Sequence, residues 1–269
     1  MKNNSNFCVR YGQWAIVAGA SEGLGAEYAK KLASRGLNLI LIARRAESLQ
    51  SLAGKLSDQY HVETKTVALD LSLLDTAGQI LEIADGLDIG LLVYNAAFSA
   101  VGPFLEKSLD DHLKEIDTNV RAPLKLLYLF GERMVRRGRG GIILMASLSA
   151  FQGSAYISTY AATKAFNIVL AEGLWEEWQR YGVDVMVCVA GAIRTPNYIA
   201  SQPKQTGRFS DAIMEPEPVV HEALAALGKR PYIIPGRMNQ FSSFIMRHLL
   251  PRKMAVQLMG KILHDMYVH

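Results

Sequence analysis

The chain has 269 residues, a hydrophobic share of 50% and a net charge of +4, which suit one α/β domain with a large core. Neither a membrane-length apolar run nor the apolar segment of a signal peptide is present, so we expect a soluble, cytoplasmic protein. The basic run at 133–139 ends an apparent helix, and Cys8 and Cys188 lie far apart, which argues against a nucleic-acid partner, a disulfide framework and a metal site.

Seven apolar segments of strand length alternate with segments of helical periodicity. The strand segments are residues 14–18, 37–43, 62–69, 90–94, 142–146, 183–190 and 232–234. Between the first two, Ala26, Ala29, Leu32 and Ala33 recur at helical spacing. This alternation predicts a single-domain Rossmann fold over residues 1–236, an α/β architecture with a doubly wound parallel sheet of about seven strands and helices on both faces.

The first predicted strand runs directly into a glycine-rich turn, and a helical pattern starts at once. Glycines at such a turn let the backbone approach a pyrophosphate, and the following helix offers free N–H groups to it. A plain strand-to-helix connection explains the same pattern equally well. If the turn binds a nucleotide, its contacts fall on Gly19, Ser21, Glu22, Gly23, Leu24 and Gly25.

The ends of the second and third strands bear on the choice of cofactor. Ala43 cannot chelate a ribose diol, whereas Arg44, with Arg45 beside it, can form a bidentate pair with a 2′-phosphate. Two solvated arginines that open the next helix are the alternative. Asp70, followed by Leu71, suits either an adenine amino group or a helix N-terminus. On balance these residues favour NADP over NAD.

Tyr160 and Lys164 are four residues apart and would share one face of a helix. A tyrosine with its ordinary pKa is a poor acid or base at neutral pH, but a nearby ammonium and an oxidised nicotinamide both lower that pKa. Ser147 ends the preceding strand, where its hydroxyl can donate to a substrate oxygen. Together with the upstream turn, these residues predict hydride transfer between a nicotinamide and a carbonyl or alcohol.

From about residue 12 to residue 236 the chain resembles the short-chain dehydrogenase/reductase family, single-domain NAD(P)-dependent oxidoreductases with a Rossmann-type sheet. Ser147 precedes Tyr160 by the 13 positions usual in that family. The sequence departs from the family pattern at Ala18, Ala97 and Ala190, where the family has threonine, glycine and proline. The matching positions are Gly19, Gly23, Gly25, Asp70, Asn95, Ala96, Asn119, Ser147, Tyr160, Lys164, Gly191 and Thr195.

The resemblance implies a role for each matching polar residue. Tyr160 would be the general acid in reduction and the base in oxidation, and Lys164 would lower its pKa and hold the nicotinamide ribose. Ser147 would polarise the carbonyl, and Asn119 would anchor a water that extends a proton relay. A homodimer or homotetramer, similar to ketoacyl and hydroxysteroid reductases, is also implied. Further cofactor contacts would come from Asn95, Ala96, Gly191, Ile193 and Thr195.

The expected substrate pocket is mostly apolar, which predicts a hydrophobic carbonyl or alcohol such as a 3-oxoacyl chain, a steroid-like ring or an aromatic ketone. Arg194 beside it either meets an anionic substrate group or forms a surface ion pair. Residues 194–217 lack periodicity and indicate a long loop or broken helix. The residues expected to line the pocket are Leu148, Phe151, Gln152, Tyr156, Ile193, Tyr198, Ile199 and Met214.

Residues 237–269 form a separate tail of two helix-period segments that Pro251 divides. We expect this helical tail to pack on the same domain or on a partner subunit, as a substrate lid or a subunit contact. A basic amphipathic pair that rests on a membrane surface is the alternative. The basic residues of the tail are Arg237, Arg247, Arg252, Lys253 and Lys261.

Taken together, the patterns favour an NADP(H)-dependent oxidoreductase that acts on a hydrophobic carbonyl or alcohol, with Tyr160 as general acid and base and without a metal. The alternative is a non-catalytic nucleotide-sensing or scaffold protein that keeps the same fold.

Overall fold

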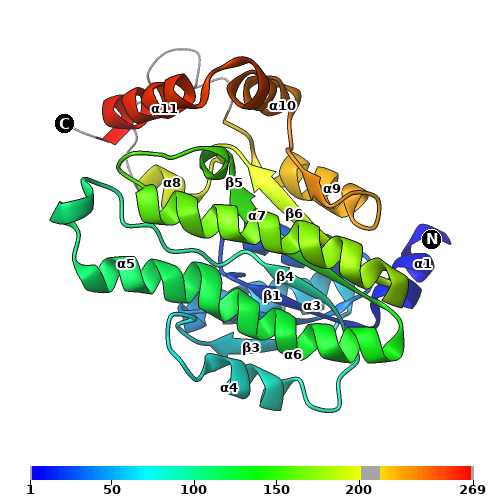
Figure 1. Ribbon diagram of the computed structural model, residues 1–269. Helices are drawn as coiled ribbons and strands as arrows, with labels where there is room; N and C mark the ends of the chain where they lie inside the picture. Colours follow the sequence, from blue (N-terminus) through cyan, green and yellow to red (C-terminus); the bar gives the residue numbers. More distant parts are fainter. Residues whose placement is uncertain (1, 201–212, 268–269) are drawn as a thin grey trace.

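A computed structural model describes residues 2–200 and 213–267 of the chain. Its seven strands form one parallel sheet in the order β3-β2-β1-β4-β5-β6-β7 (Figure 1). Every predicted strand is confirmed, with ends that differ by up to two residues. The strands are β1 (Trp14–Ala18), β2 (Asn38–Ala43), β3 (Thr64–Ala68), β4 (Ile89–Tyr94), β5 (Gly140–Ser147), β6 (Val183–Ala190) and β7 (Tyr232–Ile233).

The central strands are buried on both faces, which is why they read as unbroken apolar runs in the sequence. In β1 the side chains of Ala15 and Val17 join one hydrophobic cluster, whereas Trp14, Ile16 and Ala18 join the other. Each face of the sheet therefore has its own core, and both cores need a layer of helices.

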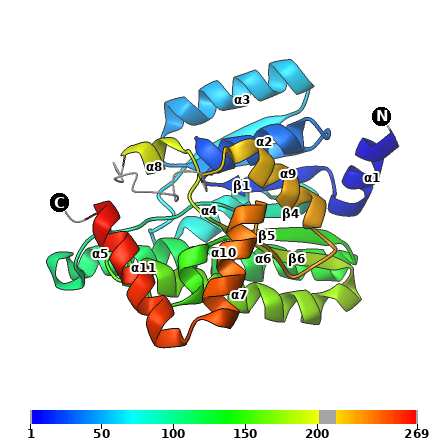
Figure 2. The same cartoon turned by 90° about the horizontal axis from the view of Figure 1, so that it is seen from above.

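Helices cover both faces, as predicted (Figure 2). One face packs against α2 (Gly23–Ala33), α3 (Ala46–Tyr60) and α9 (Pro216–Ala226). The other packs against α4 (Thr76–Ile83), α6 (Ala122–Arg137) and α7 (Ser158–Trp178). On that second side, α5 (Leu109–Ile116) continues through a π-helical turn, η2 (Asp117–Arg121), into α6.

An N-terminal helix, α1 (Lys2–Tyr11), was not predicted. The Arg10 guanidinium donates two hydrogen bonds of 2.7 Å to the Asp184 carboxylate on β6, and the Tyr11 hydroxyl donates a third of 2.8 Å. The residues joined by these bonds are more than 170 positions apart in the chain. The helix is thus held by tertiary contacts to the sheet, which a local sequence pattern does not reveal.

The tail consists of α10 (Arg237–Phe244), a π-helical turn η6 (Ile245–Leu249) and α11 (Arg252–Tyr267). It lies across the top of the molecule as drawn in Figure 1, above α7. The Arg247 guanidinium stacks on the Phe151 ring at 4.2 Å, and the ring of His264 meets that of Tyr156 at 5.7 Å. Among the described helices, none has the length and apolarity needed to cross a membrane.

The segment predicted as a long loop or broken helix begins with a short helix, α8 (Pro196–Ala200). Pro203 and Gly207, on which that prediction partly depended, lie outside the described residues. A parallel β-bridge pairs Ile193 with Met214, and the Arg194 N–H donates to the Met214 carbonyl at 2.9 Å. The bridge therefore joins the described ends of this segment beside the sheet.

Candidate active site

The predicted site residues gather at the carboxyl ends of β1, β4, β5 and β6. The strand order reverses between β1 and β4, and ligands of open α/β sheets bind at such a switch point. Gly19 follows β1, Asn95 follows β4, Ser147 ends β5 and Gly191 follows β6. Parallel pairing thus brings together residues that are far apart in the sequence.

The glycine-rich turn leaves no room for larger side chains. Gly19 has a φ of +81°, and a Cβ there would lie 2.6 Å from the Ala96 backbone nitrogen. A Cβ on Gly25 would overlap the Gly19 carbonyl oxygen. The Asn95 side chain donates to that same carbonyl at 3.0 Å, and the Asn95 N–H donates to the Ala18 carbonyl at 2.9 Å. Asn95 therefore ties β4 to the turn although Ala18 lacks the family's hydroxyl.

This turn offers backbone donors of the kind that bind a dinucleotide pyrophosphate. No side chain caps the N-terminus of α2 at Glu22, so the first N–H groups of the helix remain open to a ligand. Thr195 lies across from the turn, since a Cβ on Gly23 would sit 2.8 Å from the Thr195 methyl carbon. The turn and the loop after β6 therefore lie close together at the carboxyl end of the sheet.

The two arginines after β2 have different environments. Arg45 donates to the Glu22 carboxylate at 2.6 Å and to the Ser21 hydroxyl at 3.1 Å, so it braces the glycine-rich turn. Arg44 is exposed and, within the described residues, makes no hydrogen bond or salt bridge. Arg44 is therefore the side chain left available for a phosphate, whereas the contacts of Arg45 with the turn were not foreseen.

Asp70 stabilises the chain after β3. Its Oδ1 accepts hydrogen bonds from the Ser72 N–H at 3.0 Å and the Ser72 hydroxyl at 2.8 Å. Burial raises the pKa of Asp70, but these bonds and the nearby Lys114 and Arg44 charges bring it below its ordinary value. The helix-cap alternative is wrong, because α4 begins at Thr76, well beyond Asp70 and the buried Leu71.

Asn119 is fully buried in the π-helical turn η2, and its side chain is used entirely within the protein. Its Oδ1 accepts from the Phe98 N–H at 2.9 Å, while its Nδ2 donates to the Phe98 carbonyl at 2.8 Å and to the Thr163 hydroxyl at 3.1 Å. The Asn167 side chain donates to the Asn119 carbonyl at 3.1 Å. Among the described contacts that carbonyl accepts one hydrogen bond, which leaves it a lone pair for a water.

Thr163 and Asn167 were missed by the sequence analysis. Both are buried on α7, the helix that also holds Tyr160 and Lys164. Polar residues beside a buried lysine on one helix face are the signal that could have identified them, because buried polar groups require partners.

The catalytic candidates meet where β5 and α7 approach each other. The Ser147 hydroxyl accepts a hydrogen bond from the Ser149 hydroxyl at 3.0 Å, and it is near enough to Tyr160 to lower the pKa of that phenol. Lys164 is 3% exposed, and its ammonium donates to the Met145 carbonyl at 3.0 Å. That ammonium lies 5.5 Å from the centre of the Tyr160 ring.

Burial shifts the two titratable groups of α7 in opposite directions. It raises the pKa of Tyr160 to about 12, against the lowering effect of the Ser147 hydroxyl, and it lowers the pKa of Lys164 to about 8. The expected lowering of the Tyr160 pKa is therefore absent from the protein alone. The physical reason is that removal of both groups from water penalises their charged forms.

The residues expected to line the substrate pocket differ in their burial and in their contacts. Gln152 is buried and donates to the Leu148 carbonyl at 3.4 Å. The Phe151 ring faces Arg247 in a groove between α7 and the tail, and the Phe151 carbonyl accepts from Arg252. Tyr156 has a φ of +64°, a conformation of the left-handed region that is uncommon for a tyrosine.

The remaining candidates lie on the segment after β6. Ile193 is buried in the core and Tyr198 is half-buried on α8, whereas Ile199 is mostly exposed. Arg194 pairs with Glu215 at 2.7 Å, and both side chains are more than half exposed. The surface-ion-pair alternative for Arg194 is thus confirmed. No cluster of His, Cys, Asp or Glu able to hold a metal ion occurs in the described part of the chain.

Known proteins are similar to this chain in sequence and in fold. A family model described as short chain dehydrogenase matches residues 13–206. The chain is 34% identical to a 7beta-hydroxysteroid dehydrogenase of Clostridium sardiniense, over 87% of this chain and 90% of that protein.

Two solved structures extend the comparison to three dimensions. A structure of a 7beta-hydroxysteroid dehydrogenase has a TM-score of 0.88 at 30% identity and covers 94% of this chain and 98% of that chain. A short-chain dehydrogenase from Sphingobium yanoikuyae in complex with NADPH has a TM-score of 0.74 at 28% identity, covering 82% of this chain and 86% of that chain.

Proposed function

Because the chain belongs to the short-chain dehydrogenase family of oxidoreductases, we propose that it transfers hydride between NADP(H) and a hydrophobic carbonyl or alcohol. The observation that carries this proposal is the convergence of Ser147, Tyr160 and Lys164 at the carboxyl end of the sheet, where the glycine-rich turn and Thr195 also meet. When bound, the nicotinamide supplies or accepts the hydride.

The protein's own residues handle the proton and the substrate oxygen. Tyr160 donates its hydroxyl proton to that oxygen during reduction, and the Ser147 hydroxyl orients the same oxygen. Because burial raises the pKa of Tyr160 to about 12, the phenol is protonated at neutral pH. This protonation state suits proton donation to a carbonyl oxygen.

Lys164 and Asn119 would connect Tyr160 to a proton source. The Asn119 carbonyl keeps one lone pair, and two buried oxygens, Thr118 Oγ1 and Asn167 Oδ1, lack a partner among the described residues. Buried polar atoms of this kind are satisfied by ordered water. A water held there by the Asn119 carbonyl would serve the relay, while the Asn119 side chain keeps the turn in place.

Steroid-like ketones are the substrate class that the observations favour. Two of the three relatives described above are named for hydroxysteroids, and the pocket candidates Leu148, Tyr156 and Tyr198 offer apolar surface. Apolar pockets with a few polar groups suit rigid hydrophobic ligands of this type.

Consumption of NADPH with a steroid ketone, a 3-oxoacyl thioester and an aromatic ketone tests the function. We expect the highest kcat/KM for the steroid ketone, and a loss of about 100- to 10,000-fold in Tyr160→Phe from the missing acid. Tyr156→Phe is the matched control and should retain turnover, since it removes a hydroxyl outside the proposed proton path. Full turnover in Tyr160→Phe would refute the acid-base role, and no turnover with any ketone would favour the scaffold alternative.

Arg44 is proposed to determine the preference for NADP. Loss of a charge-assisted bidentate pair in Arg44→Ala should weaken NADPH binding by about 10- to 100-fold and leave NADH binding nearly unchanged. Arg45→Ala is the control, because Arg45 braces the turn that both cofactors would use. Titration of each variant by nicotinamide fluorescence measures the two affinities. Equal losses for NADPH and NADH in Arg44→Ala would contradict the phosphate-clamp role.

We also infer that two copies pair through α5 and α6. These helices expose a row of apolar side chains, each at least 39% exposed, and apolar patches of this kind mark interfaces. Two of them, Leu109 and Tyr128, are more than 70% exposed. The row comprises Leu109, Leu113, Ile116, Leu124 and Tyr128.

A further inference from the structure

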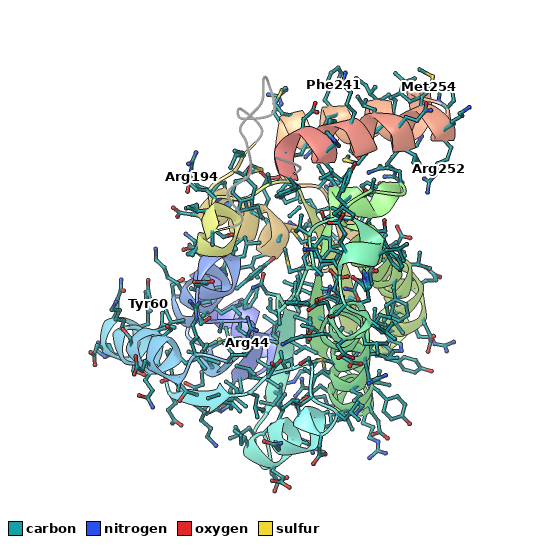
Figure 3. All side chains as sticks on the ribbon, turned by 90° about the vertical axis from the view of Figure 1, so that its left-hand side faces the viewer. Arg44, Tyr60, Arg194, Phe241, Arg252 and Met254 are labelled. Atoms are coloured by element: carbon teal, nitrogen blue, oxygen red, sulfur yellow. The ribbon has the colours of Figure 1, made fainter. Side chains whose placement is uncertain are left out.

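The tail exposes a second apolar surface, on the opposite side of α10 and α11 from the sheet. Phe241, Leu249 and Met254 are 63%, 64% and 53% exposed, which is unusual for side chains of this size. Figure 3 shows Phe241 and Met254 along the border of the tail that is turned away from the sheet. We define the outer tail surface as Met238, Phe241, Phe244, Leu249, Met254 and Leu258.

The tail also accounts for the net charge of the protein. Residues 237–269 contain five lysines and arginines and one aspartate, which amounts to +4. The whole chain also has a net charge of +4, so residues 1–236 are neutral overall. The positive charge is therefore concentrated on the element that exposes these apolar side chains.

The basic residues of the tail divide into two groups. Arg247 and Arg252 turn inward, because they contact the ring and the carbonyl of Phe151. Arg237, Lys253 and Lys261 are exposed and lack an ion-pair partner among the described residues. Three cations thus remain available beside the outer tail surface.

We propose that the outer tail surface binds the face of an anionic lipid bilayer. The apolar side chains would enter the headgroup region, and Arg237, Lys253 and Lys261 would meet lipid phosphates. A symmetric contact between two tails would bring like charges together, which disfavours a second copy as the occupant. Because no described helix can span a bilayer, the tail would lie on the membrane surface.

The inner side of α11 faces the body of the protein. His264 contacts Tyr156, and Val256 lies opposite Gly153, so α11 covers the loop that leads into α7. Membrane contact would therefore place that loop, which holds the proposed substrate residues, close to the lipid. Lipid binding itself does not depend on the proposed function.

Flotation of the full chain with two kinds of vesicle tests the proposal. We expect the protein to float with phosphatidylcholine vesicles that contain phosphatidylglycerol, to float much less with phosphatidylcholine alone, and to dissociate at high salt. Lys253→Gln with Lys261→Gln should weaken binding by about fivefold per residue. Phe241→Ser with Met254→Ser should weaken it by roughly tenfold or more.

Leu73→Ser with Leu74→Ser is the matched control, because this exposed apolar pair lies far from the tail in the sequence and precedes α4. Circular dichroism spectra and thermal midpoints would show that the variants remain folded. The proposal is overturned if the full chain does not float with the anionic vesicles, or if the control pair loses as much binding as the tail pair. A fall in oligomeric mass in the tail variants, without vesicle binding by the unchanged protein, would identify a subunit contact instead. Loss of ketone reduction would not affect any of these readouts.

Discussion

Lys164 is a cation held in a buried site with one hydrogen bond, to the Met145 carbonyl, among the described contacts. Burial of a charged ammonium costs free energy, and the lowered pKa of about 8 is the measure of that cost. The buried Lys164 ammonium therefore lowers the stability of the fold. This cost indicates that the lysine serves the chemistry of the site rather than the structure.

Replacement of Lys164 should change how stability depends on pH. The unfolded lysine keeps its proton up to its ordinary pKa of 10.5, whereas the folded one releases it near 8, so the native protein gains stability as pH rises between these values. Lys164→Met lacks this gain. Its free energy of unfolding, relative to the native protein, should fall by about 2–3 kcal/mol from pH 7 to pH 10.

Urea unfolding at both pH values measures this difference. Lys55→Met, at an exposed position of α3, provides the control and should give the same difference from the native protein at each pH. A Lys164→Met difference that does not vary with pH would show that the buried ammonium has no such cost.

At the scale of elements, the π-helical turn η2 is connected to the rest of the site by one side chain, that of Asn119. Through Asn119 it connects the chain after β4, at Phe98, to α7, at Thr163. π-Helical turns often occur at functional sites because the extra residue redirects backbone groups. Here the turn directs the Asn119 backbone carbonyl toward Asn167 on α7, and the Asn119 side chain connects the turn to Phe98 and Thr163.

Asn119→Ala should destabilise the protein by about 2–4 kcal/mol, because it leaves buried groups of Phe98 without partners. Urea unfolding measures the loss. Asn38→Ala is the control: Asn38 accepts one hydrogen bond from the Glu63 N–H near the surface, and its removal should cost about 1 kcal/mol or less. Similar losses in the two variants would contradict the bracing role of Asn119.

A helix or strand could be predicted from the sequence where neighbouring residues alone determine it. The central strands were predicted because burial on both faces makes them apolar throughout, as in β1 and β4. Helix α1 was missed because its stability comes from Asp184 on a distant strand. The two π-helical turns were missed because nothing in a residue pattern distinguishes them from the α-helices they adjoin.

At the scale of the whole molecule, the α5–α6 row and the outer tail surface are two separate apolar surfaces, and they differ in charge. Leu109→Glu with Leu113→Glu should convert the proposed homodimer to a monomer, because four carboxylates would then be buried between two copies. Sedimentation equilibrium measures the mass. The control, Leu73→Glu with Leu74→Glu, should remain a dimer, and a monomeric native protein would contradict the interface.

The site was predictable where chemistry demands a particular residue at a particular spacing. Ser147, Tyr160 and Lys164 meet this condition, and the fold brings them together. The environment of each residue was not predictable in the same way. The opposite pKa shifts of Tyr160 and Lys164 and the different contacts of Arg44 and Arg45 depend on burial and on neighbours from other elements.

The β-bridge between Ile193 and Met214 holds together the two ends of the segment that begins with α8. Its two ends are paired beside the sheet, so exchange of the residues between them leaves the paired backbone where it is. The entropy of closing a loop changes slowly with length, by about 0.6 kcal/mol for each doubling. Insertions or deletions between α8 and Met214 should therefore cost little stability, so the length of this part of the chain can vary during evolution while the bridge is kept.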